Sequence, residues 1–482
     1  MSNTNGNPQP ITPENPPTPC AEESPDLTAA AAAQYVDRSQ ALPAGPPVTI
    51  AIIGAGQRGK VYAEFALANP HLCKVVAVAE PRKRTRELMV EAHLVPEAQV
   101  FKSWEDLLAA SSACLAQTGK RIADAVVVAV QDNLHAAIVT AFAEQQYHIL
   151  CEKPLATTPE ECIRIHDAVK KSDKVFGIGH VLRYSPYNRA IADIIRSGEL
   201  GKPINIVHIE PVGHYHFAHS YVRGDWAREK DSSFSLMTKS CHDIDILGFY
   251  LSPSTPVRVS SFGSLTHFRK SEKPVAAGPA TRCMECPIRD SCPYSAKRIY
   301  LDPVTIGERG WPASTLTDGP PDIESVTEVL QTGPYGKCVY ESDNDVVDHQ
   351  VVNLEYSTGA TCSFTMVAFT EQICNRSTRI HFTHGELIGD MKTFTTTNFT
   401  TLETKQHAPL QEGGGHGGGD LGLMRAFVHA VREGRQDVLG VTVDEVLRSH
   451  MTVFAAEKSR KEGKVISCQG YEEEIRRGME AV

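Results

Sequence analysis

The sequence predicts two folded domains: an N-terminal α/β domain with a doubly wound parallel sheet, and a C-terminal α+β domain with an open, mostly antiparallel sheet. Between residues 48 and 179, short apolar runs alternate with helix-length segments, which is typical of a parallel sheet covered by helices. Beyond residue 186, most strand-like segments follow one another without helices, which favours antiparallel pairing. The third observation is a glycine-rich turn directly after the first apolar run.

That turn, at residues 54–59, has the G-x-G-x-x-G spacing of a dinucleotide-binding turn. There Gly54 permits the tight turn, Gly56 lets the backbone approach a pyrophosphate, and Gly59 lets the following helix pack closely on its strand. Glu80 ends the next strand, where a carboxylate would accept hydrogen bonds from a ribose diol. The predicted cofactor residues here are Gly54, Ala55, Gly56, Gln57, Arg58, Gly59 and Glu80.

The identity of the dinucleotide stays open at this stage. The charge of Glu80 favours NAD, because it would repel a 2′-phosphate. Arg82, Lys83 and Arg84 follow immediately and could neutralise such a phosphate, so NADP remains an alternative.

The chain divides into a tail and two domains. Residues 1–46 contain too few large apolar side chains to offset the entropy of ordering, which predicts a disordered tail. We expect residues 47–155 to form the dinucleotide-binding Rossmann domain and residues 156–482 to form the substrate and oligomerisation domain. Within the latter, residues 271–347 are long and poorly periodic, which indicates an insertion.

The composition limits the classes of binding partner that we expect. A formal net charge of −10 provides no sequence-wide basic field, so we expect no nucleic-acid partner. No apolar run reaches the roughly 18 residues of a membrane span and no signal-peptide pattern is present, which predicts a cytoplasmic protein without a membrane partner. Antiparallel sheets with an exposed face often pair between subunits, so we expect a homo-oligomer.

Lys153 follows the fifth predicted strand, at the carboxyl edge of the sheet, where doubly wound folds bind ligands. Beside a positively charged nicotinamide, a partly desolvated lysine suits proton exchange with a carbinol oxygen during hydride transfer. A solvated lysine paired with Glu152 is the alternative interpretation.

A second cluster lies in residues 234–249, which have helical apolar spacing. Lys239, His242 and Asp245 stand three residues apart and so share one helical face. His242 could act as a general base, with a carboxylate such as Asp245 fixing its tautomer. A purely structural histidine is the alternative.

Together these motifs resemble the glucose-fructose oxidoreductase, inositol dehydrogenase and MocA-like family, Gfo/Idh/MocA, over most of the chain from about residue 47. The resemblance rests on the glycine turn, the 132–135 segment, the Glu-Lys-Pro motif at 152–154 and the 242–245 helix. It implies that Lys153 and His242 form the catalytic pair. It further implies a nicotinamide side lined by Gln131, Asp132, His135, Glu152 and Lys153, and substrate contacts from Arg183 and Tyr184.

Two positions depart from the family pattern. Thr238 stands where members with an Asp-x-x-x-His helix have the acid, and Gln131 replaces a usual proline. Without that acid, we expect Lys239 to add a second positive charge or to contact substrate hydroxyls.

His416 lies inside a glycine-rich segment, residues 413–419, that precedes a predicted helix. Glycines permit close approach to a ligand, so His416 could reach the cleft, and a flexible linker is the alternative. The segment also resembles a glycine-histidine loop of NAD-dependent glycosidases in the same superfamily. Those enzymes oxidise a sugar hydroxyl transiently and then eliminate the aglycone.

Four cysteines form a C-x2-C-x5-C cluster with one distant partner: Cys283, Cys286, Cys292 and Cys338. In a cytosolic chain such spacing suggests structural zinc before disulfides. Reduced thiols packed in a loop are the alternative.

The resulting hypothesis is an NAD(P)-dependent oxidoreductase that transfers a hydride between nicotinamide and a hydroxyl-bearing carbon of a sugar, sugar acid or cyclitol. An NAD-dependent glycosidase is the enzymatic alternative. A non-catalytic dinucleotide-binding regulator is the third interpretation, suggested by Thr238 and the long insertion.

Overall fold

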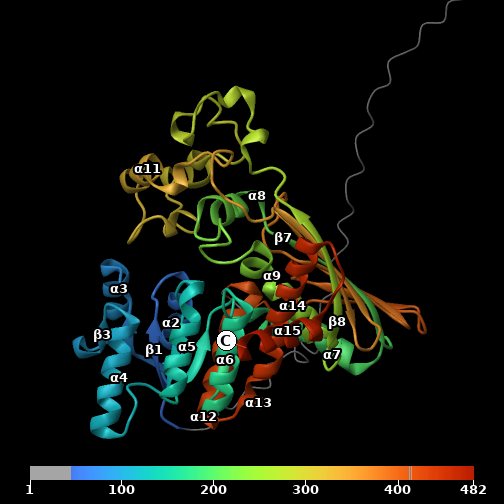
Figure 1. The fold of residues 1–482 in the computed structure, drawn as a ribbon, viewed down its shortest axis with the longest axis horizontal. Coiled ribbons are helices and arrows are strands. Elements are labelled where there is room, and N and C mark those ends of the chain that lie inside the picture. Colours follow the sequence, from blue (N-terminus) through green and yellow to red (C-terminus); the bar gives the residue numbers. More distant parts are fainter. Residues whose placement is uncertain (1–44, 412, 414, 482) are drawn as a thin grey trace, which may run out of the picture.

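The computed structural model describes residues 45–411, 413 and 415–481, which form two sheets joined by helices (Figure 1). The tail predicted for residues 1–46 lies outside the described part except for its last two residues. Among the described residues, no helix combines the length and apolarity that crossing a bilayer requires.

The first sheet has six parallel strands in the order β3-β2-β1-β4-β5-β6. Its strands are rich in buried β-branched residues, as expected for strands covered on both faces. The order reverses beside β1, so a crevice opens between the carboxyl ends of β1 and β4, where such folds bind ligands. The strands are β1 (Val48–Ile53), β2 (Cys73–Ala79), β3 (Val100–Phe101), β4 (Ala125–Val128), β5 (His148–Cys151) and β6 (Phe176–Ile178).

Helices cover both faces of this sheet, as a doubly wound fold requires. Ser103 and Thr158 cap two of them by accepting backbone N–H hydrogen bonds. The last strand, β6, lies beyond the predicted domain boundary at residue 155, so the sheet extends to Ile178. The helices are α2 (Gln57–Ala68), α3 (Lys83–His93), α4 (Trp104–Thr118), α5 (His135–Glu144) and α6 (Pro159–Ser172).

The glycine turn between β1 and α2 is too crowded for side chains at two positions. Gly54 has a φ of +85°, and a Cβ there would lie 2.3 Å from the Ala129 carbonyl oxygen. A Cβ on Gly59 would lie 1.9 Å from the Gly54 carbonyl oxygen. These contacts agree with the tight turn and the close helix packing that the sequence predicts for these residues.

The second sheet has nine strands in the order β14-β13-β12-β11-β7-β10-β9-β8-β15. Only β7 and β10 pair in parallel, so the predicted open, mostly antiparallel sheet is confirmed. The strands are β7 (Pro203–Pro211), β8 (Pro256–Ser264), β9 (His349–Tyr356), β10 (Thr361–Val367), β11 (Ser377–Phe382), β12 (Gly385–Gly389), β13 (Phe394–Asn398), β14 (Glu403–His407) and β15 (Ile466–Ser467).

Helices fill the space between the two sheets, and several return to the first domain. α9 packs on β7 and β10, while α14 packs on α9, β8 and α6. α12 crosses back and packs against α2 and β1. These helices are α7 (Pro186–Ser197), α9 (Ser235–Leu251), α12 (Gly419–Glu433), α13 (Gln436–Leu439), α14 (Val443–Glu462) and α15 (Cys468–Glu480).

The predicted insertion falls in the connection between β8 and β9, which contains only α10 (Asp302–Thr305), α11 (Ile323–Thr332) and short turns. It stands above both sheets in Figure 1. Its Ser314 hydroxyl accepts a hydrogen bond from Gln57 Nε2 at 3.2 Å, at the start of α2. Its Asp318 carboxylate accepts from the backbone N–H groups of Arg84 and Thr85. The insertion therefore bridges to the dinucleotide-binding side of the first domain.

Replacing Gly59 by alanine should destabilise the fold, because the new methyl group would overlap the Gly54 carbonyl oxygen. We expect urea denaturation to show a loss of about 1–3 kcal/mol or more in the free energy of unfolding. Gly478→Ala is the matched control, since it lies in α15 with no heavy atom within 4 Å of the added Cβ. An unchanged unfolding midpoint for Gly59→Ala would show that the turn is looser than described.

Candidate active site

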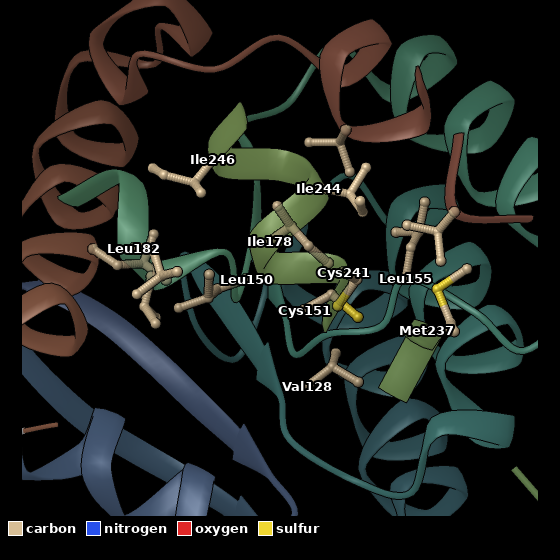
Figure 2. Packing of buried hydrophobic residues seen from close by; sticks show 14 of the residues in the cluster. Val128, Leu150, Cys151, Leu155, Ile178, Leu182, Met237, Cys241, Ile244 and Ile246 are labelled. Atoms are coloured by element: carbon tan, nitrogen blue, oxygen red, sulfur yellow. The ribbon is translucent and has the colours of Figure 1, made fainter. Parts of the chain in front are cut away.

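Helix α9 packs its apolar side against the carboxyl ends of β4, β5 and β6 (Figure 2). This packing buries nearly the whole helix and fixes its position over the edge of the parallel sheet. The side chains in this part of the core include Val128, Leu150, Cys151, Leu155, Ile178, Leu182, Met237, Cys241, Ile244 and Ile246. Lys153, which follows β5 after one residue, consequently lies close to the polar residues of α9.

Lys153 and His242 are brought together there. The Lys153 Nζ donates a hydrogen bond to the Thr238 carbonyl at 2.8 Å, one helical turn before His242. Burial holds the pKa of His242 well below its usual value, and the neighbouring Lys153 charge lowers that pKa further. The imidazole is therefore neutral near pH 7 and can accept a proton.

The alternative pairing of Lys153 with Glu152 is not what the structure shows. The Glu152 carboxylate accepts hydrogen bonds from Arg58 Nε at 2.6 Å, from the Tyr62 hydroxyl, and from the backbone N–H of Lys153. Although burial raises the pKa of Glu152, the Arg58 charge holds it below its usual value. Glu152 thus acts as an internal anchor for the segment that presents Lys153.

Asp245 does not orient His242, which corrects the sequence interpretation. Its carboxylate accepts hydrogen bonds from Arg183 Nε at 2.7 Å and Arg183 Nη2 at 2.8 Å, and lies 3.0 Å from His180 Nδ1. A spacing of three residues on a helix aligns two side chains only roughly, and the buried guanidinium is the stronger partner. Among the described residues, His242 Nδ1 has no hydrogen-bond partner.

His416 lies beside His242, with ring centroids 5.5 Å apart. Asp420, in the first turn of α12, holds His416 through a contact of 3.2 Å to Nδ1. Burial lowers the pKa of His416, and the Asp420 carboxylate opposes that shift. From the sequence, residues 413–419 could be a ligand loop or a linker. In the structure, His416 of this segment lies beside His242, one of the two predicted catalytic residues.

Arg58 connects this side of the site to the glycine turn. Its Nη2 donates to Asp420 Oδ1 at 2.8 Å, and its Nε donates to Glu152. Burial opposes the charge, but Glu152 and Asp420 raise the pKa of the guanidinium well above its usual value. Arg58 was predicted to bind cofactor, and the structure gives it carboxylate partners from the protein itself.

The N-terminus of α2 fits a pyrophosphate. Gly56 is the N-cap residue, no side chain caps the helix, and its first turn contains no acidic residue. The first N–H groups of the helix are therefore open to an anion.

Glu80 is buried below the turn and accepts hydrogen bonds from the Ala55 N–H at 2.8 Å and from Arg82. A Cβ on Gly56 would lie 3.1 Å from Arg82 Nη2, so the guanidinium extends over the glycine turn. The predicted carboxylate and a neighbouring cation therefore both lie at the glycine turn.

Three other residues predicted to line the nicotinamide side bond to protein groups instead. Asp132 accepts from Trp226 Nε1 at 2.9 Å and from the Ser232 hydroxyl at 2.7 Å. His135 Nδ1 lies 2.7 Å from the Pro154 carbonyl oxygen, and Gln131 Nε2 donates to a carboxylate at 3.1 Å. These side chains position the Lys153 segment and the facing domain.

The residues predicted to contact substrate differ in the partners that they have within the protein. Arg183 is buried in its pair with Asp245, and the buried Tyr184 hydroxyl donates to the Leu439 carbonyl at 3.1 Å, so both side chains have partners within the protein. Lys239 lies 3.3 Å from Glu210 Oε1 and donates to Cys374 Sγ at 2.8 Å. Burial disfavours its charge, but the neighbouring thiol and carboxylate raise the pKa of Lys239, which stays positive.

Three further residues near Lys239 had no signal in the sequence: His216, Trp311 and Cys374. His216 lies 3.7 Å from Cys374 Sγ, and its ring meets the indole of Trp311 edge-on at a centroid distance of 4.8 Å. Burial lowers the pKa of His216 well below its usual value, with contributions from the charges of Lys239 and Lys153. These residues come from α8 (His214–Phe217), the loop after β10 and the insertion, so no local spacing indicated them.

Residues 48–180 match the model of an oxidoreductase family with an NAD-binding Rossmann fold, Gfo/Idh/MocA. The match identifies residues 48–180 as a domain of this family's NAD-binding type. The putative oxidoreductase YteT of Bacillus subtilis (strain 168) is 25% identical over 320 residues, which are 62% of this chain and 70% of that protein. An inositol 2-dehydrogenase of Rubrobacter xylanophilus is 25% identical over 211 residues, 42% of this chain and 52% of the relative. The chain thus spans about half of that dehydrogenase.

Solved structures of this Gfo/Idh/MocA fold superpose over most of the chain. Levoglucosan dehydrogenase in complex with NADH and levoglucosan has a TM-score of 0.62 at 17% identity, covering 88% of this chain and 99% of that one. An oxidoreductase domain protein from Kribbella flavida has a TM-score of 0.64 at 16% identity, covering 88% and 100%. At these identities the likeness establishes the fold.

Replacing Asp245 by asparagine should destabilise the protein, because the buried Arg183 guanidinium loses its closest charge partner. We expect urea denaturation at pH 7 to show a loss of about 3–5 kcal/mol in the free energy of unfolding. Asp193→Asn is the control, since Asp193 forms an exposed pair with Arg196 and should change stability by less than about 1 kcal/mol.

The pH dependence of that loss has a defined sign. Burial raises the pKa of Asp245, but the Arg183 and His180 partners hold it below the usual carboxyl range in the folded state. Its stabilising contribution is therefore present above the ordinary carboxyl pKa and is lost as the pH falls through the folded-state pKa. A difference between wild type and variant that grows in acid would contradict this assignment.

Proposed function

We propose that the protein is an NAD(P)-dependent oxidoreductase that transfers a hydride between nicotinamide and a hydroxyl-bearing carbon of a sugar, sugar acid or cyclitol. The observation that carries this proposal is the meeting of the Lys153 ammonium and the neutral His242 imidazole at the carboxyl edge of the parallel sheet. The inositol and levoglucosan dehydrogenases that resemble this chain support the substrate class.

In the proposed reaction, the bound dinucleotide supplies a nicotinamide ring that accepts or donates the hydride. The open N-terminus of α2 holds the pyrophosphate. Lys153 exchanges a proton with the substrate oxygen, and its positive charge stabilises negative charge that develops there. His242, neutral and adjacent, assists by accepting a hydrogen bond or a proton from the hydroxyl.

Substrate hydroxyls are recognised, in this proposal, by residues around that pair. His416 is held by Asp420 and presents the rest of its ring beside His242. Lys239 adds the second positive charge expected from the sequence, next to His216. The Trp311 indole closes the same wall from the insertion and offers an apolar face to a sugar ring.

The proposed homo-oligomer would use the outer face of the second sheet. On β7, Val207 and Ile209 point away from the core and are exposed, and Phe262 on β8, which lies on the same face, is 67% exposed. An apolar sheet face of this kind commonly pairs with a second copy.

The relatives named above are oxidoreductases or dehydrogenases, so the glycosidase and the non-catalytic regulator have no counterpart among them. One assay separates the glycosidase from the oxidoreductase. Aryl glycosides incubated with the protein and NAD would release aglycone without net NADH only if the glycosidase mechanism operates.

Replacing Lys153 by methionine should lower turnover by about 100-fold or more, because the proton-exchanging ammonium is lost while the glycine turn is untouched. The assay follows NADH or NADPH absorbance with a panel of sugars, sugar acids and inositols. Fluorescence titration with NADH should give the same dissociation constant as the wild-type protein within about twofold, since Lys153 lies outside the α2 anion site.

Lys102→Met is the matched control, because Lys102 is an exposed lysine of the same domain and should change neither quantity. Turnover of Lys153→Met equal to that of the wild-type protein would eliminate the proposed mechanism. Absence of NADH and NADPH binding to the wild-type protein would eliminate the proposed function itself.

A further inference from the structure

The insertion brings a carboxylate to the first turn of α3, in the dinucleotide-binding domain. Asp318 Oδ2 accepts a hydrogen bond from the Arg84 N–H at 3.1 Å. Its Oδ1 accepts from the Thr85 N–H at 3.0 Å and from the Thr85 hydroxyl at 2.8 Å. Among the described residues of α3 itself, the N-cap residue Arg82 makes no side-chain capping bond and the first turn contains no acidic residue. The helix is therefore capped by a residue 234 positions beyond Arg84 in the chain.

The residues around Asp318 hold it against α3. Gly319 has a φ of +127°, and a Cβ there would lie 3.5 Å from Arg84 Cγ, so this turn packs directly on the helix. The Thr317 hydroxyl closes the turn by donating to the Gly319 carbonyl at 2.9 Å. Two prolines, at residues 320–321, then restrict the backbone up to α11.

Behind this turn, the insertion is a packed unit. α11 begins with a capping box between Asp322 and Ser325, and it buries Val326 and Leu330. It packs against the short turn that contains the first of the cysteines considered as zinc ligands. Those cysteines are free thiols that line one small cavity: Cys283, Cys286, Cys292 and Cys338. The insertion can therefore keep Asp318 in a fixed place.

The charge of Asp318 acts beside Glu80, the carboxylate predicted to bind the ribose. The Arg82 N–H and Nε donate to Glu80 Oε1 at 2.9 and 3.0 Å, and Arg82 Nη2 donates to Oε2 at 3.2 Å. These hydrogen bonds raise the pKa of Arg82, burial opposes the shift, and the charges of Glu80, Asp318 and Asp225 add to it. The guanidinium that extends over the glycine turn is thus already paired with carboxylates of the protein.

The neighbouring basic residues also have partners. Lys83 Nζ lies 3.9 Å from Glu87 Oε1, and Arg84 Nη1 lies 3.4 Å from Glu87 Oε2. Arg86 Nη1 donates to the backbone carbonyls of the two residues that follow β2. The positive charge that could have neutralised a 2′-phosphate is therefore shared with acidic side chains and carbonyl oxygens.

A 2′-phosphate would meet two obstacles in this arrangement. In doubly wound dinucleotide folds, the ribose lies at the acid that follows the second strand, and a 2′-phosphate lies beside the residues after it. Here the N–H groups of the first turn of α3, which could bind an anion, are occupied by Asp318. The charges of Glu80 and Asp318 would also repel a phosphate. A free 2′-hydroxyl meets neither obstacle, because it can donate a hydrogen bond to Glu80.

We propose that Asp318 acts with Glu80 to select NAD over NADP, so that the insertion contributes to coenzyme specificity. This inference rests on the proposed function and deepens it by naming the coenzyme. Glu80 discriminates through its hydrogen bond to the ribose hydroxyl. Asp318 discriminates through its charge and through the N–H groups that it occupies.

The test is fluorescence titration of the full-length protein with NADH and with NADPH, which gives the ratio of the two dissociation constants. We expect the wild-type protein to bind NADH about 100-fold more tightly than NADPH. Asp318→Asn removes the charge but can keep the capping hydrogen bonds, because asparagine also caps helices well. In this variant we expect the ratio to fall by about 10-fold, mainly through tighter binding of NADPH.

Three further variants separate the charge of Asp318 from a loosening of the insertion. Asp290→Asn removes the same charge elsewhere in the insertion, where Asp290 pairs with Lys297, and should leave the ratio unchanged. Ser314→Ala removes the hydrogen bond with Gln57 and should change both dissociation constants by the same factor. Asp318→Glu keeps the charge and should keep the wild-type preference for NADH.

The results that would overturn this inference differ from those that would overturn the proposed function. Wild-type protein that binds NADPH as tightly as NADH would overturn the inference and leave the proposed function standing. A wild-type ratio in Asp318→Asn, with circular dichroism showing a folded chain, would overturn the role of Asp318. Absence of binding of both coenzymes would instead overturn the proposed function, and this inference with it.

Discussion

The paired guanidinium of Arg58, which is partly buried, is the group on which the site depends. It pairs with Glu152 after β5 and with Asp420 on α12, so one cation joins the glycine turn, the Lys153 segment and the loop that contains His416. Such a pair contributes less to net stability than its Coulomb energy suggests, because both partners are desolvated. The three charged groups instead fix the relative positions of the segments that carry them. Removing any one of them would leave an uncompensated charge among the others.

A second group of charges fixes the other side of α9. Arg376 Nε lies 2.6 Å from Glu210 Oε2 and 2.9 Å from Asp243 Oδ1, while Lys239 adds the fourth charge near Glu210. Two positive and two negative groups thus balance inside the protein. Together with the apolar contacts in Figure 2, they hold the helix between the antiparallel sheet and the parallel sheet.

The parts of this structure that could be predicted from the sequence are those with a local signal. Alternating strands and helices and the glycine spacing each depend on neighbours in the chain, and both agree with the structure. The position of Lys153 followed from its place after a strand. Periodicity could not show that Asp245 meets Arg183, because that pairing depends on how two distant segments pack. For the same reason, His216 and Trp311 gave no signal.

The return of α12 to the first domain has a consequence for synthesis. This helix packs on β1 and α2. Just beyond it, the side-chain amide of Gln436 accepts a hydrogen bond from the Phe176 N–H and donates one to the Phe176 carbonyl, on the edge strand β6. The nucleotide half is therefore sealed by residues that leave the ribosome long after its own strands. Contacts so far apart in the chain form slowly. Until then, that edge strand stays exposed, and the nascent chain has to avoid aggregation through it.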